Sequence, residues 1–232
     1  VRTTLAKYEG TELGRQEIHA EILDSVKGRV YSSFSRHPSP DGNLDDSVRD
    51  LGGEILVGMD FNVNPMSAVI AVRAADECHV LAALEVEASN TEQVAGEIAR
   101  RFPGRRVIVC PDPSGNARKT SAPVGQTDFT ILRRHGFEVR APDAAPAVVD
   151  RVNNTQAMLL QGVRRRVLIH PEGAAPLVKA LWGLQYKTGT SIRDKDSGFD
   201  HICDALDYLL WQEFNVLVEP EDRSVRTFDH VV

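Results

Sequence analysis

Hydrophobic residues between positions 54 and 214 occur in short runs whose spacing alternates between that of strands and that of helices. Continuous or alternating apolar runs rich in β-branched residues predict strands at 54–61, 67–73, 79–87, 106–110, 137–140 and 167–169. Apolar positions at helical spacing, with capping and stop signals, predict helices at 91–102, 127–135, 148–160, 174–184 and 199–214. This mixture indicates an α/β protein.

The lengths of the connections predict how the strands pair. Only short breaks separate the first three strands, which favours an antiparallel meander, because parallel neighbours need a long crossover. The helix at 91–102 supplies such a crossover, so the strand at 106–110 is expected beside the first strand and parallel to it. We therefore predict a central mixed sheet of five or more strands, a three-strand antiparallel meander plus parallel strands, flanked by helices.

The chain divides by composition into three parts. Residues 1–50 are polar, with a possible amphipathic helix near 15–26 and a loop rich in Pro, Gly, Asp and Ser near 35–47, and we interpret them as a connector. Residues 51–216 carry the predicted strands and helices and form the compact domain. Residues 217–232 read as a polar tail. Because the first residue is Val, we expect the chain to be a fragment or a processed form.

Composition narrows the function classes. The 232 residues carry a formal net charge of −6, which argues against a chain that coats itself in nucleic acid but allows a local basic face. No apolar run is long enough to cross a bilayer, so a membrane role is not expected. Three scattered cysteines without metal-type spacing suggest buried free thiols in a reducing compartment.

Two carboxylates occupy equivalent places in the predicted sheet. Asp60 ends the first strand and Asp112 follows the strand at 106–110, so both should emerge at the same sheet edge. A charge at the end of a buried strand is costly unless it is paired, protonated or bound to a metal. The alternative for each is local: Asp60 caps the following turn, and Asp112 forms an Asx turn in its Pro-Asp-Pro-Ser-Gly context.

The last predicted helix supplies a third carboxylate. Packed across the sheet, it would bring Asp204 to Asp60 and Asp112, with His201 on the same helical face and Asp200 beside it. Alternatively, Asp204 is a solvated surface residue and His201 is merely packed. Three carboxylates within a few ångströms require protons or a cation, and hard divalent ions prefer carboxylate oxygens. Such a cluster can hold two ions, one activating water and one stabilising the leaving oxygen of a phosphodiester.

These residues resemble a known family. Strand-end Asp60, strand-end Asp112 and the helical sequence DHICDALDY, with His201, Asp204, Ala205 and Tyr208, are similar to the C-terminal nuclease domain of the tailed-bacteriophage terminase large subunit, the DNA-packaging motor. That domain has an RNase H-like (RuvC/integrase-like) fold. The GxxxxGK[ST] phosphate loop of the family's ATPase does not occur in this sequence.

The resemblance implies a role for each of these residues. Asp60, Asp112 and Asp204 would form the catalytic, metal-binding triad for two Mg²⁺ or Mn²⁺ ions, with His201 and Asp200 in support. The substrate would be double-stranded DNA, cut during viral genome packaging in the host bacterial cytoplasm. The portal protein, the small terminase subunit and the motor's own ATPase domain would be partners.

Basic residues near the predicted site are candidates for phosphate contacts, and each is equally well explained as solvated surface charge. They are Arg118, Lys119, Lys187, Arg193 and Lys195. Two other functions stay open. One is a different RNase H-fold nuclease, such as a junction resolvase or a cleaver of RNA–DNA hybrids. The other is a non-enzymatic module that docks on the portal or another terminase protein.

Overall fold

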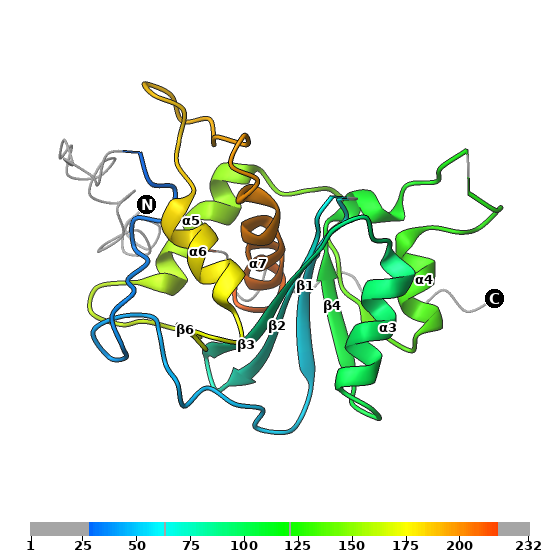
Figure 1. Cartoon of the computed structure of the whole chain (residues 1–232), viewed down its shortest axis with the longest axis horizontal. Coiled ribbons are helices and arrows are strands. Elements are labelled where there is room, and N and C mark those ends of the chain that lie inside the picture. The colour runs from blue at the N-terminus through cyan, green and yellow to red at the C-terminus, as the bar shows by residue number, and fades with distance from the viewer. Residues whose placement is uncertain (1–27, 63, 121, 218–232) are drawn as a thin grey trace.

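The computed structural model describes residues 28–62, 64–120 and 122–217, and a six-stranded mixed sheet lies at its centre (Figure 1). The possible helix near 15–26 and all but the first residue of the predicted tail lie outside the described residues. In chain order, the elements are β1 Ile55–Asp60, β2 Met66–Ala74, β3 Glu77–Val86, α3 Thr91–Arg101, β4 Val107–Pro111, the 3₁₀ helix η1 Pro113–Asn116, α4 Asp128–Arg134, β5 Glu138–Val139, α5 Val148–Leu159, β6 Val167–Ile169, α6 Ala175–Gly183 and α7 Asp200–Glu213. Each predicted strand and helix between residues 54 and 214 is present.

The sheet has the order β5-β4-β1-β2-β3-β6. Strands β1, β2 and β3 form an antiparallel meander, β4 pairs in parallel with β1, and β5 pairs in parallel with β4. Strand β6 adds to the far edge, parallel to β3. The predicted fold class is confirmed, including the parallel pairing of the first strand with the strand that follows the crossover helix α3.

Helices cover both faces of the sheet, α5, α6 and α7 on one and α3 and α4 on the other (Figure 1). Side chains alternate along β1 between the two apolar cores, as the pleat of a strand requires. Ile55, Val57 and Met59 belong to the core under α3 and α4, whereas Leu56 faces the core under α5, α6 and α7. A strand covered on both faces explains the continuous apolar run in the sequence.

Gly58 allows α7 to lie close to β1. A Cβ atom built on Gly58 would lie 1.9 Å from the carbonyl oxygen of Ala205 and 2.9 Å from the Leu209 side chain, so no larger residue fits without moving the helix. Gly58 and Asp60 are two positions apart and therefore face the same side of the sheet. The absence of a side chain at Gly58 thus brings the acidic helix against the strand end that carries Asp60.

The segment before β1 packs on the same core. Val30, Tyr31 and Phe34 are buried among side chains of α5, α6 and α7. The fully buried Asn43 donates hydrogen bonds to the carbonyls of Leu159 and Val167, which fastens this segment beside β6. Residues 28–50 therefore contribute to the packing of the domain, and the division at residue 51 stays a prediction.

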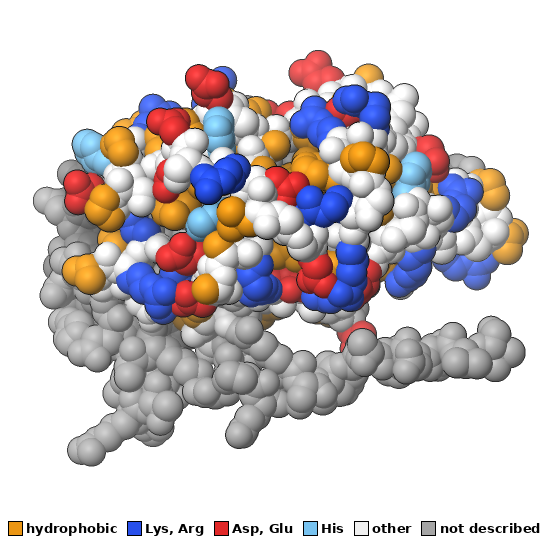
Figure 2. Space-filling model, turned by 90° about the horizontal axis from the view of Figure 1, so that it is seen from below, with side chains coloured by type: hydrophobic (Ala, Val, Ile, Leu, Met, Phe, Trp, Pro, Cys, Tyr) orange, Lys and Arg blue, Asp and Glu red, His pale blue; other side chains and the backbone are white. Residues whose placement is uncertain are grey.

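The end of the sheet opposite Asp60 carries interspersed basic and acidic side chains (Figure 2). Arg106 there bonds to Glu54 and Glu138, and Arg105 bonds to Asp50. Each of these two arginines is therefore paired with at least one carboxylate. The three cysteines are buried free thiols, as predicted. None of the described helices is long and apolar enough to cross a membrane.

Candidate metal centre and active site

Asp60 and Asp112 lie at the carboxyl ends of the neighbouring parallel strands β1 and β4. The register pairs Met59 with Pro111, so the next residue of each strand is a carboxylate. The backbone N–H of Asp112 donates to the carbonyl of Met59 at 2.9 Å, which fixes the turn after β4 against the end of β1. The Asp112 side chain also accepts from the Ser114 N–H at 2.8 Å. The Asx turn considered as an alternative is therefore present, and it fixes the direction of the Asp112 side chain at the end of β4.

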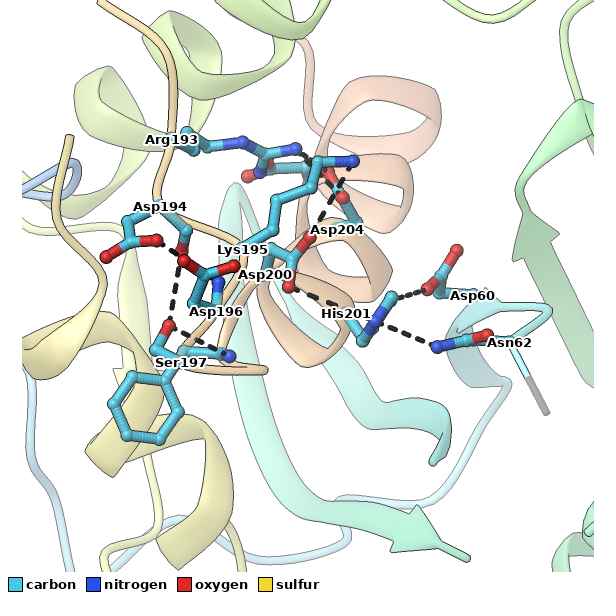
Figure 3. A network of polar contacts seen from close by, with 12 residues as sticks. Asp60, Asn62, Arg193, Asp194, Lys195, Asp196, Ser197, Asp200, His201 and Asp204 are labelled. Carbon is cyan, nitrogen blue, oxygen red and sulfur yellow. Dashed lines mark hydrogen bonds and ion pairs between the residues drawn. The ribbon is translucent and has the colours of Figure 1, made fainter. Parts of the chain in front are cut away.

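Asp60 is linked to α7 through His201 (Figure 3). His201 Nδ1 lies 2.9 Å from an oxygen of Asp60, and His201 Nε2 lies 2.8 Å from the side-chain nitrogen of Asn62. Because an ionised carboxylate only accepts hydrogen bonds, Nδ1 donates to Asp60 and Nε2 accepts from Asn62. The ring is thereby held between the strand end and the loop that follows it.

Burial and, to a smaller extent, two neighbouring carboxylates disfavour the ionised form of Asp60. Burial raises the pKa of Asp60 to about 6, the hydrogen bond from His201 opposes the rise, and the nearby carboxylates of Asp204 and Asp112 add to it. Asp204 and Asp112 thus lie near enough to Asp60 to influence its ionisation. A cation placed among them would favour the ionised form of Asp60.

Asp204 is held by two arginines that come from different parts of the chain. Arg193 Nη2 lies 2.9 Å from each oxygen of Asp204, and Arg151 Nη1 lies 3.1 Å from Oδ1. Both arginine side chains are almost fully buried, 5% and 4% exposed, while that of Asp204 is 14% exposed. Asp204 is therefore not a freely solvated surface residue, and its charge is partly compensated within the protein.

Asp207, one turn further along α7, is fully buried and structural in character. It accepts hydrogen bonds from the Tyr31 hydroxyl at 2.8 Å and from Thr155 Oγ1 at 2.6 Å. Burial raises the pKa of Asp207 above its ordinary value, and the neighbouring Asp204 adds to the rise. The polar contacts from α5 and the N-terminal segment thus hold α7 in a fixed rotation over the sheet.

The donor set fits a divalent cation in its chemistry. Asp60 and Asp112 adjoin at the strand ends, and the charges of Asp112 and Asp204 both act on Asp60. Asp200 adds a buried carboxylate whose Oδ1 lies 3.9 Å from His201 Nε2. Oδ1 of Asp200 has no hydrogen-bond partner among the residues that the structure describes. As the side chains lie, however, the described residues contain no group of three or more His, Cys, Asp and Glu close enough to hold a metal ion. Asp204 is instead engaged by the two arginines.

The predicted phosphate-contacting residues fall into two groups. Arg118, Lys119, Lys187 and Lys195 are exposed. Arg193 is 6% exposed and bonded to Asp204, so its guanidinium is already occupied inside the protein. We therefore retain the four exposed residues as proposed DNA contacts and treat Arg193 as a partner of Asp204.

Sequence reasoning missed Arg151 and Asn62 as members of the site. Arg151 lies on α5, a helix that the sequence marks only by its apolar spacing, and Asn62 reads as a turn residue. The DHICDALDY motif does include Tyr208, whose hydroxyl interacts with Asp112. No pattern in a single sequence distinguishes Arg151 from the other arginines.

The fold and these strand-end carboxylates define an RNase H-like domain. The family model described as the terminase RNase H-like domain matches residues 57–213, and the chain belongs to that family. This finding confirms the resemblance noted from the motifs. Comparison with curated protein sequences gives no match.

Solved structures of phage terminases share the fold. The large terminase of a thermophilic bacteriophage superposes with a TM-score of 0.61 at 16% identity, covering 80% of this chain and 44% of that one. The nuclease domain of the bacteriophage P22 large terminase gives 0.59 at 13% identity, covering 83% and 98%. The bacteriophage SPP1 large terminase nuclease domain with bound Mn gives 0.51 at 16% identity, covering 74% and 97%. The chain thus spans less than half the length of the thermophilic phage terminase and nearly the whole of the two nuclease domains.

Proposed function

We propose that this chain is a metal-dependent endonuclease that cuts double-stranded DNA during the packaging of a phage genome. The observation that carries the proposal is the meeting of Asp60 and Asp112 at adjacent strand ends, under the electrostatic influence of Asp204, in a member of the terminase RNase H-like family. A related domain, that of bacteriophage SPP1, is described with bound Mn.

Under this proposal Asp60, Asp112 and Asp204 would hold two Mg²⁺ or Mn²⁺ ions. When bound, such ions supply activation of water and stabilisation of the leaving oxygen of a phosphodiester. His201 orients the Asp60 carboxylate through Nδ1, and Asn62 fixes the ring from its other side. The Tyr208 hydroxyl lies close to Asp112, and Arg151 and Arg193 hold Asp204.

The proposed DNA contacts lie on two exposed segments of the chain. Arg118 and Lys119 follow η1, and Lys187 and Lys195 lie on the turn-rich segment between α6 and α7, where Tyr186 bridges to Arg193. Contacts of this kind recognise phosphate rather than base sequence. They suit an enzyme that cuts DNA of many sequences, as headful packaging requires. The host cytoplasm is the expected place of action, and the portal, the small subunit and an ATPase domain are the proposed partners.

A plasmid-cutting assay tests the proposal. Supercoiled DNA is incubated with the chain in Mg²⁺, Mn²⁺, Ca²⁺ or EDTA, beside the variant Asp112→Asn. We expect cutting with Mg²⁺ or Mn²⁺ that both EDTA and the substitution abolish. Linear duplex, a four-way junction and an RNA–DNA hybrid are compared in parallel, and preference for the junction or the hybrid would move the assignment to another class of RNase H-fold nuclease. A folded parent that cuts no substrate in any metal would refute the nuclease and favour a docking role.

A further inference from the structure

Two polar side chains of helix α5 contact aspartates of helix α7. Arg151 and Thr155 are one helical turn apart, so they lie on the same face of α5. Arg151 donates to Asp204, and Thr155 donates to Asp207, which lies three positions further along α7. The two helices are thus joined by one ion pair and one hydrogen bond in register, and each contact supports a different aspartate.

Arg151 also reaches the second carboxylate of the proposed site. Its guanidinium carbon lies 4.0 Å from the centre of the Tyr208 ring. Burial raises the pKa of the Tyr208 hydroxyl, and the nearby carboxylate of Asp112 adds to the rise, so this hydroxyl lies close to Asp112. Arg151 therefore contacts Asp204 directly and packs on the ring of Tyr208, whose hydroxyl lies close to Asp112.

The surroundings of Arg151 make a purely stabilising role a poor explanation. Its side chain is 4% exposed, and Nε has no hydrogen-bond partner among the residues that the structure describes. A buried ion pair with an unsatisfied donor gains little stability, because desolvation of both charges offsets their attraction. Fixing the direction of a carboxylate is the function that such a rigid, planar group performs well.

We propose that Arg151 is a positioning residue: it sets the direction of Asp204, and through its contact with the Tyr208 ring it also restrains the surroundings of Asp112, for the binding of a divalent cation. The inference rests on the proposed function for the kind of ligand, and it adds a residue and a helix that neither the motif nor the family match singles out. Outer residues that orient metal ligands typically contribute 10–100-fold to metal affinity.

The sign of the effect separates positioning from simple electrostatics. Arg151 is a positive charge beside a proposed cation site, so its removal should tighten cation binding if only charge matters. Removal should weaken binding if Arg151 positions the carboxylates. A role in folding alone would change the thermal midpoint and leave the affinity of the folded protein unaltered.

The experiment is a titration with Mn²⁺ alone, followed by electron paramagnetic resonance of the free ion, on the whole chain well below its thermal midpoint. Arg151→Met keeps the length and apolar stem of the side chain and removes the charge, while Arg151→Lys keeps the charge and loses the planar fork. The matched control is Thr155→Val, which breaks a contact at the same helix interface but on Asp207. Circular dichroism verifies that each variant is folded.

We expect Mn²⁺ affinity to fall about 10–100-fold in Arg151→Met, to fall less in Arg151→Lys, and to stay within about twofold in Thr155→Val. Unchanged or tighter binding in a folded Arg151 variant overturns the inference while leaving the proposed function intact. An equal loss in Thr155→Val also overturns it, because the effect would then come from general loosening of the interface. A parent that binds no Mn²⁺ refutes both the inference and the metal-dependent nuclease. If Arg151→Met does not fold, Arg151→Lys decides by the same criteria.

Discussion

Ionisation of Asp60 should make the cation-free protein less stable as the pH rises. The pKa of Asp60 is about 6 in the folded protein against an ordinary value of 3.8, and its side chain is 13% exposed. A carboxyl whose folded-state pKa is raised contributes stability that is fully present below the unfolded pKa and is lost as the pH rises through the folded pKa. Since one pKa unit corresponds to about 1.36 kcal/mol, the full loss is about 3 kcal/mol, of which about 2 kcal/mol falls between pH 4.5 and 7.5.

The variant Asp60→Asn cannot ionise and should escape this loss. We expect the free energy of unfolding of Asp60→Asn, relative to the parent, to increase by about 2 kcal/mol between pH 4.5 and 7.5, or about 4–8 °C in thermal midpoint for a chain of this size. The assay is urea unfolding in EDTA, followed by tryptophan fluorescence at both pH values. Asp196→Asn, a change at an exposed carboxylate on the neighbouring segment, should follow the parent at both.

Two results would refute this reasoning. If the parent and Asp60→Asn lose stability in parallel, burial and the neighbouring carboxylates do not raise the pKa of Asp60 in the folded protein. If excess Mn²⁺ at pH 7.5 stabilises Asp60→Asn as much as the parent, the cation binds elsewhere. We expect Mn²⁺ at 100 times its dissociation constant to stabilise the parent alone, by about 2.7 kcal/mol.

Three further predictions concern the packing of α7 on β1, the hydrogen bond from Tyr31 to Asp207, and DNA binding. Gly58→Ala places a Cβ atom 1.9 Å from the carbonyl oxygen of Ala205 in α7. We therefore expect the free energy of unfolding, measured in urea, to fall by about 1–3 kcal/mol or more, and Mn²⁺ binding to weaken. Full retention of both would contradict the close approach. Tyr31→Phe removes a donor to the buried Asp207 and should cost about 1–3 kcal/mol, measured in the same way, whereas an unchanged midpoint would show that this hydrogen bond adds nothing. The double substitution of Arg118 and Lys119 by Ala should lower duplex affinity and reduce the slope of log affinity against log salt by about 0.9 for each phosphate that is no longer neutralised, and an unaltered slope would remove both residues from the DNA surface.

Much of the fold follows from local sequence signals. The crossover helix made β4 parallel to β1, and the short connections made the meander antiparallel, so the meeting of Asp60 and Asp112 was predictable from connection lengths alone. The N-cap of α3 was also predictable from the sequence, and in the structure the Asn90 side chain accepts a hydrogen bond from the Gln93 N–H at 3.0 Å. These features depend on residues close together in the chain.

The electrostatic partners of the site were not predictable in this way. Arg151 and Arg193 reach Asp204 from positions 53 and 11 residues away, and nothing in their local sequence marks them. Arg193 reads as a surface residue because polar residues and glycines surround it, yet its side chain folds inward onto Asp204. Such pairs form only when separate elements pack, and therefore only the assembled structure reveals them.

Anomalous diffraction from crystals of the chain soaked in Mn²⁺ would test the central claim most directly. We expect Mn²⁺ peaks bounded by the carboxylates of Asp60, Asp112 and Asp204, and we expect these peaks to be absent or weaker in crystals of Asp60→Asn. A well-ordered structure with Mn²⁺ absent from this sheet edge, or bound only elsewhere on the protein, would contradict it.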